Sequence, residues 1–167
     1  MNGLDCKINI PYPTVEVTEP NAEYAARLSV FFAGRDSELS ALLQYTYQSQ
    51  ILKAKNAYIS DILQCISITE MRHYEMLGEM ILLLGADPRV AAQNRGRYVY
   101  WNGAGVTYAK HAERMLKDNI ISERRAVASY NNFIKGCKDE KINKVIKRIV
   151  LDEEHHFKLF NSLLTEL

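Results

Sequence analysis

The sequence predicts an all-α protein built as a bundle of four long helices. Long stretches carry apolar residues at helical spacing, and the alternation typical of strands is almost absent. Glycine and proline gather at a few positions that would separate the helices. With 167 residues, of which 47% are hydrophobic and 25% charged, the chain fits one globular domain with a substantial core.

The first part of the chain divides into an extended arm and a long helical stretch. Residues 1–20 hold three of the four prolines, so we expect an extended N-terminal arm, followed by a helical-bundle domain over 21–167. Asn21 is a typical N-cap residue, and the first helix is expected over 22–53. Gly34 is its weak point, where the stretch could divide into two helices.

Three further helices are expected after a short polar turn. The second covers 57–85 and is closed by Gly85, and the third and fourth cover 105–136 and 139–166. Residues 86–104 form the one long irregular stretch. It is long enough, at about 3.3 Å per extended residue, to cross a four-helix bundle. Two antiparallel helix pairs joined by this crossover are therefore the expected fold.

The charge balance argues against several classes of partner. Lys and Arg number 21 against 20 for Asp and Glu, which gives no electrostatic footprint for nucleic acid. The sequence lacks an apolar run of the ~20 residues that a membrane span needs, and its first residues lack a signal-peptide pattern. Three unclustered cysteines, Cys6, Cys65 and Cys137, are typical of a reducing compartment. We therefore expect a cytoplasmic protein with no nucleic-acid or membrane partner.

The two halves of the chain repeat each other weakly but in register. "ELSALLQY" and "ERRAVASY" share E-x-x-A-x-x-x-Y, which pairs Glu38 with Glu123 at an offset of 85. "EMRHYEML" and "EEHHFKLF" share E-x-x-H followed by an aromatic residue, at an offset of 83. Each half is therefore a helix with one Glu followed by a helix with Glu-x-x-His.

Helical geometry brings these residues to one level. Glutamate and histidine three positions apart are neighbours on a helix surface. The midpoint between Glu38 and Glu70 is Ala54, inside the first turn, and the midpoint between Glu123 and Glu153 falls at the second turn. Two antiparallel hairpins would then gather four carboxylates and two imidazoles at the centre of the bundle.

Apolar residues flank each motif at helical spacing, so the motifs are predicted to be buried. Four buried carboxylates without a counter-charge would each cost several kcal/mol or would have to be protonated. Two divalent cations balance four carboxylates, and neutral imidazoles complete their coordination. Oxygen ligands with a little imidazole suit iron or manganese, whereas zinc would normally have fewer carboxylates or some thiolate.

At these motifs the sequence resembles the ferritin-like di-iron carboxylate superfamily, especially its rubrerythrin and bacterioferritin branches. The resemblance covers about residues 22–166 and implies a centre of two iron ions, with manganese as the alternative. It implies that Glu70 and Glu153 bridge the two metals. It further implies one ion completed by Glu38 with His73 and the other completed by Glu123 with His156.

The resemblance also implies residues around the ligands. Asp152 precedes a bridging Glu, as in the D-E-x-x-H form of the motif, and is expected to hold the ring N–H of His73. The matching position in the other half is Thr69, so the two halves are not equivalent.

Two tyrosines and a methionine near the predicted ligands are best explained as residues that pack within the bundle. Tyr45 and Tyr130 lie two turns from the single glutamates and are expected to be core residues with hydrogen-bonded hydroxyls. Met71 stands where bacterioferritin has its haem-ligating Met, but one Met at a helical position is more often packing, so haem is not expected.

The sequence lacks several features of rubrerythrins and ferritins, and this limits the functions that the resemblance implies. Ala126 stands where rubrerythrins place an extra Glu ligand, and the rubredoxin domain of rubrerythrins has no counterpart, so electrons would come from a separate donor protein. The sequence also leaves no room for the short fifth helix that ferritins use to build a cage. We therefore expect a homodimer or small homo-oligomer, in which the N-terminal arm would have a surface to pack on.

The expected function is a dinuclear oxidoreductase acting on peroxide or O₂, a rubrerythrin-like peroxidase. Manganese catalase and bacterioferritin-like iron oxidation and storage are the alternatives. A bundle that uses metal purely as a structural staple is a further possibility.

Overall fold

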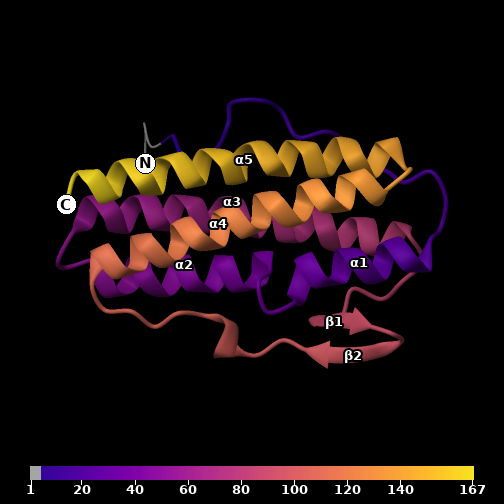
Figure 1. The fold of residues 1–167 in the computed structure, drawn as a ribbon, viewed down its shortest axis with the longest axis horizontal. Helices are drawn as coiled ribbons and strands as arrows, with labels where there is room; N and C mark the ends of the chain where they lie inside the picture. The colour runs from indigo at the N-terminus through magenta and orange to yellow at the C-terminus, as the bar shows by residue number, and fades with distance from the viewer. Residues whose placement is uncertain (1–4) are drawn as a thin grey trace.

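The computed structural model describes residues 5–167 and forms a four-helix bundle with a small β-hairpin at one side (Figure 1). The first bundle helix is divided into α1 (Ala22–Ala33) and α2 (Glu38–Leu52). The others are α3 (Ala57–Leu83), α4 (Ala112–Gly136) and α5 (Glu140–Thr165). Within this part of the chain, none of the helices has the length and apolar character that spanning a membrane requires.

The helices pair as the sequence predicts. α2 packs antiparallel along α3 and α4 along α5, each pair joined by a short turn (Figure 1). α3 and α4 run in the same direction, which requires the long crossover between them. The prediction of two antiparallel pairs joined by a crossover is confirmed.

The break in the first bundle helix lies at Gly34, the predicted weak point. The N–H of Gly34 donates to the carbonyl of Val30, and a Cβ at Gly34 would lie 2.4 Å from that oxygen. A side chain at this position would therefore force the backbone apart. The chain restarts at Ser37, whose hydroxyl caps α2 by accepting from the N–H of Ser40. Glu38 thereby becomes the first residue of α2, where the helix dipole favours a negative charge.

The crossover contains structure that the sequence analysis did not predict. β1 (Ala91–Asn94) and β2 (Arg97–Tyr100) form an antiparallel hairpin, whose turn places Arg95 and Gly96 at positive φ. Neither strand alternates between buried and exposed residues, and β2 is exposed along its whole length, so the pattern that reveals a half-buried strand is missing. The hairpin is held by neighbours far away in sequence, because the N–H of Gln93 donates to Ser29 on α1 (2.7 Å).

The second half of the crossover is also more extended than expected. After a short 3₁₀ helix (Gly103–Gly105) the chain stays non-helical up to His111, so α4 begins seven residues later than predicted, at Ala112 instead of 105. A tertiary contact explains this delay, since the N–H of Thr107 donates to the side-chain oxygen of Gln44 on α2 (2.9 Å).

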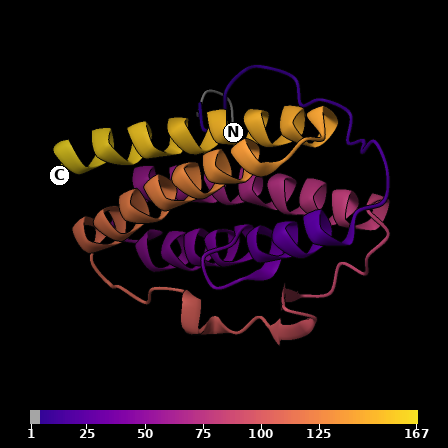
Figure 2. The same cartoon turned by 45° about the vertical axis from the view of Figure 1, so that its right-hand side comes forward.

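The N-terminal segment runs along α5 on the opposite side of the bundle from the β-hairpin, as both views show (Figures 1 and 2). From residue 5 to 20 it contains no helix or strand, and the first four residues of the predicted arm lie outside the described part. Thr18 anchors its end, with both its N–H and its hydroxyl on Asp139, the N-cap of α5. The segment packs on its own bundle, so it gives no argument for a partner subunit.

The expectation of three reduced cysteines was wrong. Cys6 of the arm and Cys65 of α3 form a disulfide across a sequence separation of 59, while Cys137 is free and buried. Spacing in the sequence does not reveal this pair because the arm brings Cys6 back across α3. The prediction of a cytoplasmic location therefore loses the support that it drew from the cysteines.

A buried amide network joins the two helix pairs. Gln44 and Gln48 of α2 both donate to the side-chain oxygen of Asn119 on α4 (3.0 and 2.9 Å), and Asn119 donates back to Gln48 (2.7 Å). All three side chains are almost completely shielded from solvent. Buried amides of this kind stabilise a fold when every member is bonded and destabilise it when one is missing.

Replacing Asn119 with Ala should therefore lower the free energy of unfolding by about 3 kcal/mol, because two buried glutamine amides lose their partner. Urea denaturation of the metal-free protein would measure the change. Asn131→Ala, at an exposed position of the same helix, is the matched control and should change stability by less than about 0.5 kcal/mol. Equal effects of the two substitutions would contradict a stabilising role of the network.

Candidate metal centre

The predicted ligand residues meet at the centre of the bundle, and all six are buried. Glu38 comes from α2, Glu123 from α4, and each Glu-x-x-His motif from one of the two longest helices. Their side chains are at most 4% exposed. They form two groups of potential ligands, in each of which the ligand atoms lie within 4.8 Å of one another. The groups are Glu38, Glu70, His73 and Glu153, and Glu70, Glu123, Glu153 and His156.

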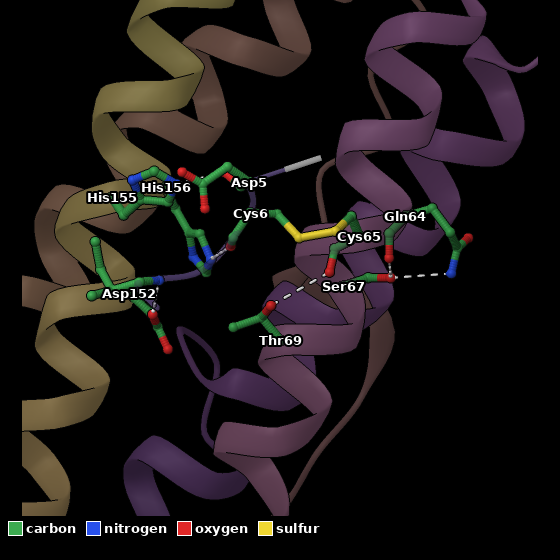
Figure 3. The surroundings of a disulfide bond; sticks show 10 residues. Asp5, Cys6, Gln64, Cys65, Ser67, Thr69, Asp152, His155 and His156 are labelled. Atoms are coloured by element: carbon green, nitrogen blue, oxygen red, sulfur yellow. Dashed lines mark hydrogen bonds between the residues drawn. A yellow bond between two sulfur atoms is a disulfide. The ribbon is translucent and has the colours of Figure 1, made fainter. Parts of the chain in front are cut away.

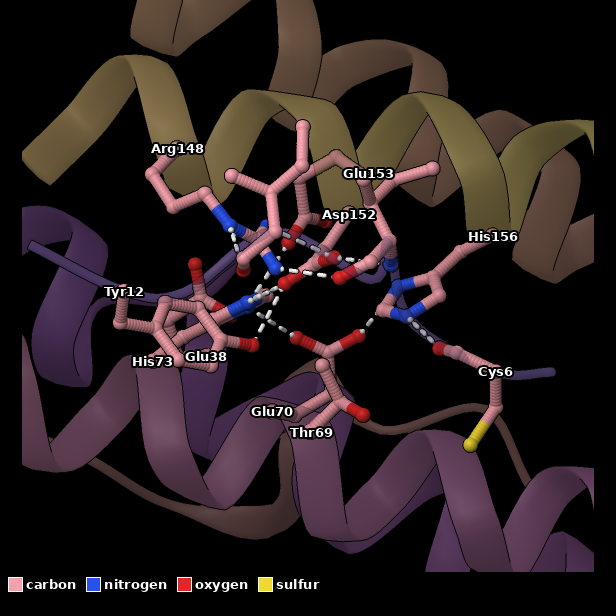
Figure 4. Close-up of polar contacts among 12 residues, drawn as sticks. Cys6, Tyr12, Glu38, Thr69, Glu70, His73, Arg148, Asp152, Glu153 and His156 are labelled. Carbon is pink, nitrogen blue, oxygen red and sulfur yellow. Dashed lines mark hydrogen bonds and ion pairs between the residues drawn. The ribbon is translucent and has the colours of Figure 1, made fainter.

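Glu70 and Glu153 belong to both groups. In Figure 4 the Glu70 carboxylate points from α3 into the space between the rings of His73 and His156. Its two oxygens face different rings, with Oε2 lying 3.1 Å from Nδ1 of His73 and Oε1 lying 3.0 Å from Nδ1 of His156. A carboxylate so placed has the geometry of a bridge between two cations.

The contacts of His73 indicate a cation position. Its Nδ1 lies 3.0 Å from Glu153, 3.1 Å from Glu70 and 3.6 Å from Glu38. One ring nitrogen carries at most one proton, so it cannot satisfy three carboxylates. Convergence of three carboxylates on one ring nitrogen is the arrangement expected of ligands around a metal ion.

Unpaired polar atoms give an independent test of whether a metal fits. Glu70 Oε1, Glu153 Oε1 and His156 Nδ1 are all buried and make no hydrogen bond within residues 5–167, although Glu70 Oε1 lies 3.0 Å from Nδ1 of His156 and Glu153 Oε1 lies 3.0 Å from Nδ1 of His73. Buried polar atoms are nearly always bonded, and each unbonded one carries a cost of about 1–3 kcal/mol. All three atoms face the centre of the cluster. The donor set therefore fits two hard or borderline divalent cations.

The outer ring nitrogens fix which nitrogen faces the cluster. Nε2 of His73 lies 3.1 Å from Asp152, and Nε2 of His156 lies 2.9 Å from the backbone carbonyl of Cys6. A carbonyl can only accept, so Nε2 of His156 carries the proton and Nδ1 keeps its lone pair for the centre of the cluster. Sequence reasoning pointed to Asp152 but missed Cys6, which is 150 residues away in the chain.

Asp152 is itself held by three groups. It accepts hydrogen bonds from the N–H of Ile8 (2.8 Å) and the hydroxyl of Tyr12 (2.5 Å), and it forms an ion pair with Arg148 (2.8 Å; Figure 4). Burial would raise the pKa of Asp152, but the hydrogen bonds from His73, Tyr12 and Arg148 lower it well below its usual range. Asp152 is thus a fixed, ionised acceptor.

Thr69, the counterpart of Asp152 in the other half, has a different role. Its hydroxyl donates to the carbonyl of Cys65 on its own helix (3.5 Å). Met71 is 43% exposed and therefore points away from the buried cluster.

The two tyrosines bond across the halves. The hydroxyl of Tyr45 donates to Glu123, and that of Tyr130 donates to Glu38, so each tyrosine holds the glutamate of the opposite helix pair. Burial raises the pKa of both tyrosines well above the usual value, which keeps the phenolic protons in place as donors.

The carboxylates repel one another strongly. Burial, followed by the charges of neighbouring carboxylates, raises the pKa of Glu153 to about 8. The pKa values of Glu70 and Glu123 are also well above the usual value, mainly through burial. Burial would likewise raise the pKa of Glu38, but hydrogen bonding to His73 lowers it overall. Without cations the cluster therefore takes up protons instead.

The two histidines titrate in opposite directions. Burial would lower the pKa of His73, but its bonds to Asp152 and three glutamates raise it well above the usual value. Burial lowers the pKa of His156, which faces fewer carboxylates.

A cavity of about 360 Å³ reaches the cluster from the break between α1 and α2. Glu38, Glu123 and Glu153 line it together with Tyr45 and Tyr130, and the exposed residues Arg35, Asp36 and Arg125 also line it. The cavity gives a small solute a route to the carboxylate side of the centre.

Comparison with known proteins agrees with this geometry. The family model described as "Manganese containing catalase" matches residues 10–112. A probable manganese catalase of Clostridium acetobutylicum is 25% identical over 174 residues, covering 92% of this chain and 75% of the relative. A bacterioferritin of Desulfovibrio desulfuricans is 26% identical over 140 residues, covering 81% of this chain and 73% of the relative.

Among solved structures, that of KatB, a manganese catalase from Anabaena PCC7120, superimposes with a TM-score of 0.85 at 28% identity. The match covers 95% of this chain and 78% of KatB. These findings confirm the predicted resemblance to the ferritin-like superfamily. They also select, among its branches, one that the sequence analysis had as an alternative: the chain belongs to the manganese-containing catalase family.

Proposed function

We propose that this protein is a dinuclear manganese enzyme that disproportionates hydrogen peroxide, 2 H₂O₂ → 2 H₂O + O₂. The observation that carries the proposal is the pair of candidate ligand groups that share Glu70 and Glu153, three of whose glutamates line a cavity of about 360 Å³. The family match supports manganese, and iron is the alternative for the same ligand set.

Under this proposal each ion would be held by four of the six residues, two of which would be shared by both ions. Glu70 and Glu153 would bridge the ions, with Glu38 and His73 completing one and Glu123 and His156 completing the other. When bound, two such ions would supply reversible two-electron redox chemistry.

The protein's own part is to hold the ligands and to admit peroxide. Tyr130 and Tyr45 hold Glu38 and Glu123 by hydrogen bonds, which limits how far these two carboxylates swing. The cavity leads to these same glutamates and to Glu153, so peroxide would arrive on the carboxylate side. The imidazole rings lie on the other side, where Asp152 and the Cys6 carbonyl hold them.

A rubrerythrin-like peroxidase is the second candidate, since it uses a similar centre. It needs an electron donor protein, and the extra carboxylate of rubrerythrins is replaced by Ala126, which lines the cavity. Iron oxidation of the bacterioferritin type is a third candidate, which the bacterioferritin relative supports.

Assays on protein loaded with manganese or with iron would separate these functions. A catalase evolves one O₂ for every two peroxide molecules consumed and needs no donor. Peroxide consumption that depends on a reduced donor and yields no O₂ would favour the peroxidase. Retention of many more than two irons per chain would favour iron storage. Two tightly bound ions with none of these activities would leave a structural role and contradict the proposal.

Substitution of a bridging carboxylate tests the site. Glu70→Ala or Glu153→Ala should leave at most one weakly held ion per chain, because each bridge touches both ions and offsets their repulsion. Oxygen evolution should fall by more than about 100-fold, beyond the usual cost of losing an outer-sphere partner.

Glu154→Ala is the matched control, since Glu154 is the next residue on the same helix and faces solvent. Metal content and activity should stay within about twofold of the unmodified protein. Loss of metal in Glu154→Ala with both ions kept in Glu153→Ala would show that the helix register of the proposed site is wrong.

The metal-free protein should lose stability as the pH rises from about 4.5 to about 8. The folded-state pKa of Glu153 is about 8 against 4.5 for an ordinary glutamate, so the folded chain binds the extra proton in this window. Stability therefore falls by about 1.4 kcal/mol per pH unit for each such carboxyl. The raised pKa values of Glu70, Glu123 and His73 act in the same direction, whereas the lowered pKa of His156 opposes it up to pH 6.5.

Urea unfolding at several pH values, with and without two equivalents of Mn²⁺, would measure this dependence. Glu153→Gln removes one titrating group and should flatten the metal-free profile. Metal-loaded protein should show the opposite trend, because rising pH removes the protons that compete with the ions. A metal-free profile that rises over this window would contradict the proposed protonation of the cluster.

A further inference from the structure

The two histidines of the cluster are held on their outer nitrogens by different partners. His73 has the carboxylate of Asp152, which lies on the neighbouring helix α5. His156 has the backbone carbonyl of Cys6, which lies in the N-terminal arm. A backbone group in an arm keeps its place only if the arm itself is held.

The internal repeat shows which residues occupy equivalent positions beside the two histidines. With the offset of 83 that relates the two Glu-x-x-His motifs, Thr69 corresponds to Asp152 and Cys65 corresponds to Arg148. In one half, Arg148 forms an ion pair with Asp152 one turn further on, and Asp152 holds His73. In the other half, the hydroxyl of Thr69 bonds to its own helix. The backbone carbonyl of Cys6 in the arm therefore accepts the hydrogen bond from His156 that a carboxylate would otherwise accept.

A disulfide connects the arm to this place. Cys65 is bonded to Cys6, whose own carbonyl is the acceptor for His156 (Figure 3). Cys6 is only 6% exposed. Cys65 thus stands at the position equivalent to Arg148 and, like Arg148, fixes the group that accepts the ring proton of a histidine.

The arm has further contacts on the other side of Cys6. The N–H of Ile8 donates to Asp152, and the carbonyls of Ile8 and Ile10 accept from Arg148 (2.7 and 2.9 Å). These contacts hold the arm to α5. The disulfide ties it to α3, so the Cys6 carbonyl is held from both helices that carry a Glu-x-x-His motif.

We propose that the Cys6–Cys65 disulfide is a positioning element for His156 and thereby secures the metal ion bound by Glu70, Glu123, Glu153 and His156. This inference rests on the proposed function in taking His156 as a metal ligand. Reduction by a dithiol breaks the S–S bond, two electrons and two protons convert the sulfurs to thiols, and the reagent becomes a disulfide. The carbonyl then loses its tie to α3, whereas His73 keeps Asp152.

Metal titration of the Cys65→Ser variant tests the proposal. Metal-free protein is titrated with Mn²⁺, with free Mn²⁺ followed by electron paramagnetic resonance and bound metal counted after gel filtration. Unmodified protein should bind two ions per chain. In Cys65→Ser the affinity for one ion should fall by about 10- to 100-fold, the usual effect of losing an outer-sphere partner of a ligand histidine, while the other ion is held as before.

Cys137→Ser is the matched control, since this cysteine is also buried but is free. It should bind both ions normally. Unmodified protein that has been reduced, alkylated and freed of reductant gives the same comparison without a substitution and should behave like Cys65→Ser. Circular dichroism of each sample checks that the helices remain.

A rescue experiment separates positioning from general stability. Thr69→Asp introduces the carboxylate that the other half uses, so the double variant Cys65→Ser/Thr69→Asp should recover affinity for the second ion without the disulfide. Equal affinities in unmodified protein and Cys65→Ser would overturn the proposal, and so would equal weakening of both ions without rescue. Failure of the unmodified protein to bind two ions would overturn the proposed function itself, and this inference with it.

Discussion

The fold depends on one electrostatic constraint, the convergence of four carboxylates in a space that water barely reaches. Glu38, Glu70, Glu123 and Glu153 are each at most 4% exposed, and burial, with the charges of neighbouring carboxylates as a further cause, raises the pKa of Glu70, Glu123 and Glu153. Removing charge from water at this depth costs far more than the marginal stability of a domain allows, unless cations or protons compensate. The compensating charge is therefore part of what stabilises the bundle.

This constraint explains the hydrogen bonds that surround the cluster. Tyr45 and Tyr130 each donate to the glutamate of the opposite helix pair, so the two hairpins are tied together at the level of the charges. The network of Gln44, Gln48 and Asn119 ties α2 to α4 on the same side of the bundle. Rigid connections of this kind keep the ligand atoms close although they repel one another.

That the six candidate ligand residues meet in one buried cluster could be predicted because their signal is local and repeated. A Glu-x-x-His motif places two ligands on one helix face, and the midpoints at the turns fix the height of each pair. The break at Gly34 was also visible, because a glycine inside a helical stretch is costly. The β-hairpin and the late start of α4 were not visible. They depend on contacts such as that of Thr107 with Gln44, which leave no periodic pattern.

The contacts of the N-terminal arm were the largest omission, for a related reason. A backbone carbonyl is present at every residue, so nothing in the sequence marks that of Cys6 as the partner of His156. The pairing of Cys6 with Cys65 needs the path of the arm, which irregular segments do not encode locally. What the sequence does contain is the inequality of the halves, since Thr69 cannot serve as Asp152 does. This difference indicates that His156 needs another hydrogen-bond acceptor, but it does not indicate which residue provides the acceptor.

The cavity and the N-terminal arm lie on different sides of the buried cluster. The cavity reaches Glu38, Glu123 and Glu153, the carboxylate side, through the break between α1 and α2. The arm covers the imidazole side, where Tyr12 packs edge-on against His73 with ring centroids 6.1 Å apart. A solute that enters through the cavity meets the glutamates held by Tyr45 and Tyr130 first, whereas the arm holds the ring of His156 from the other side.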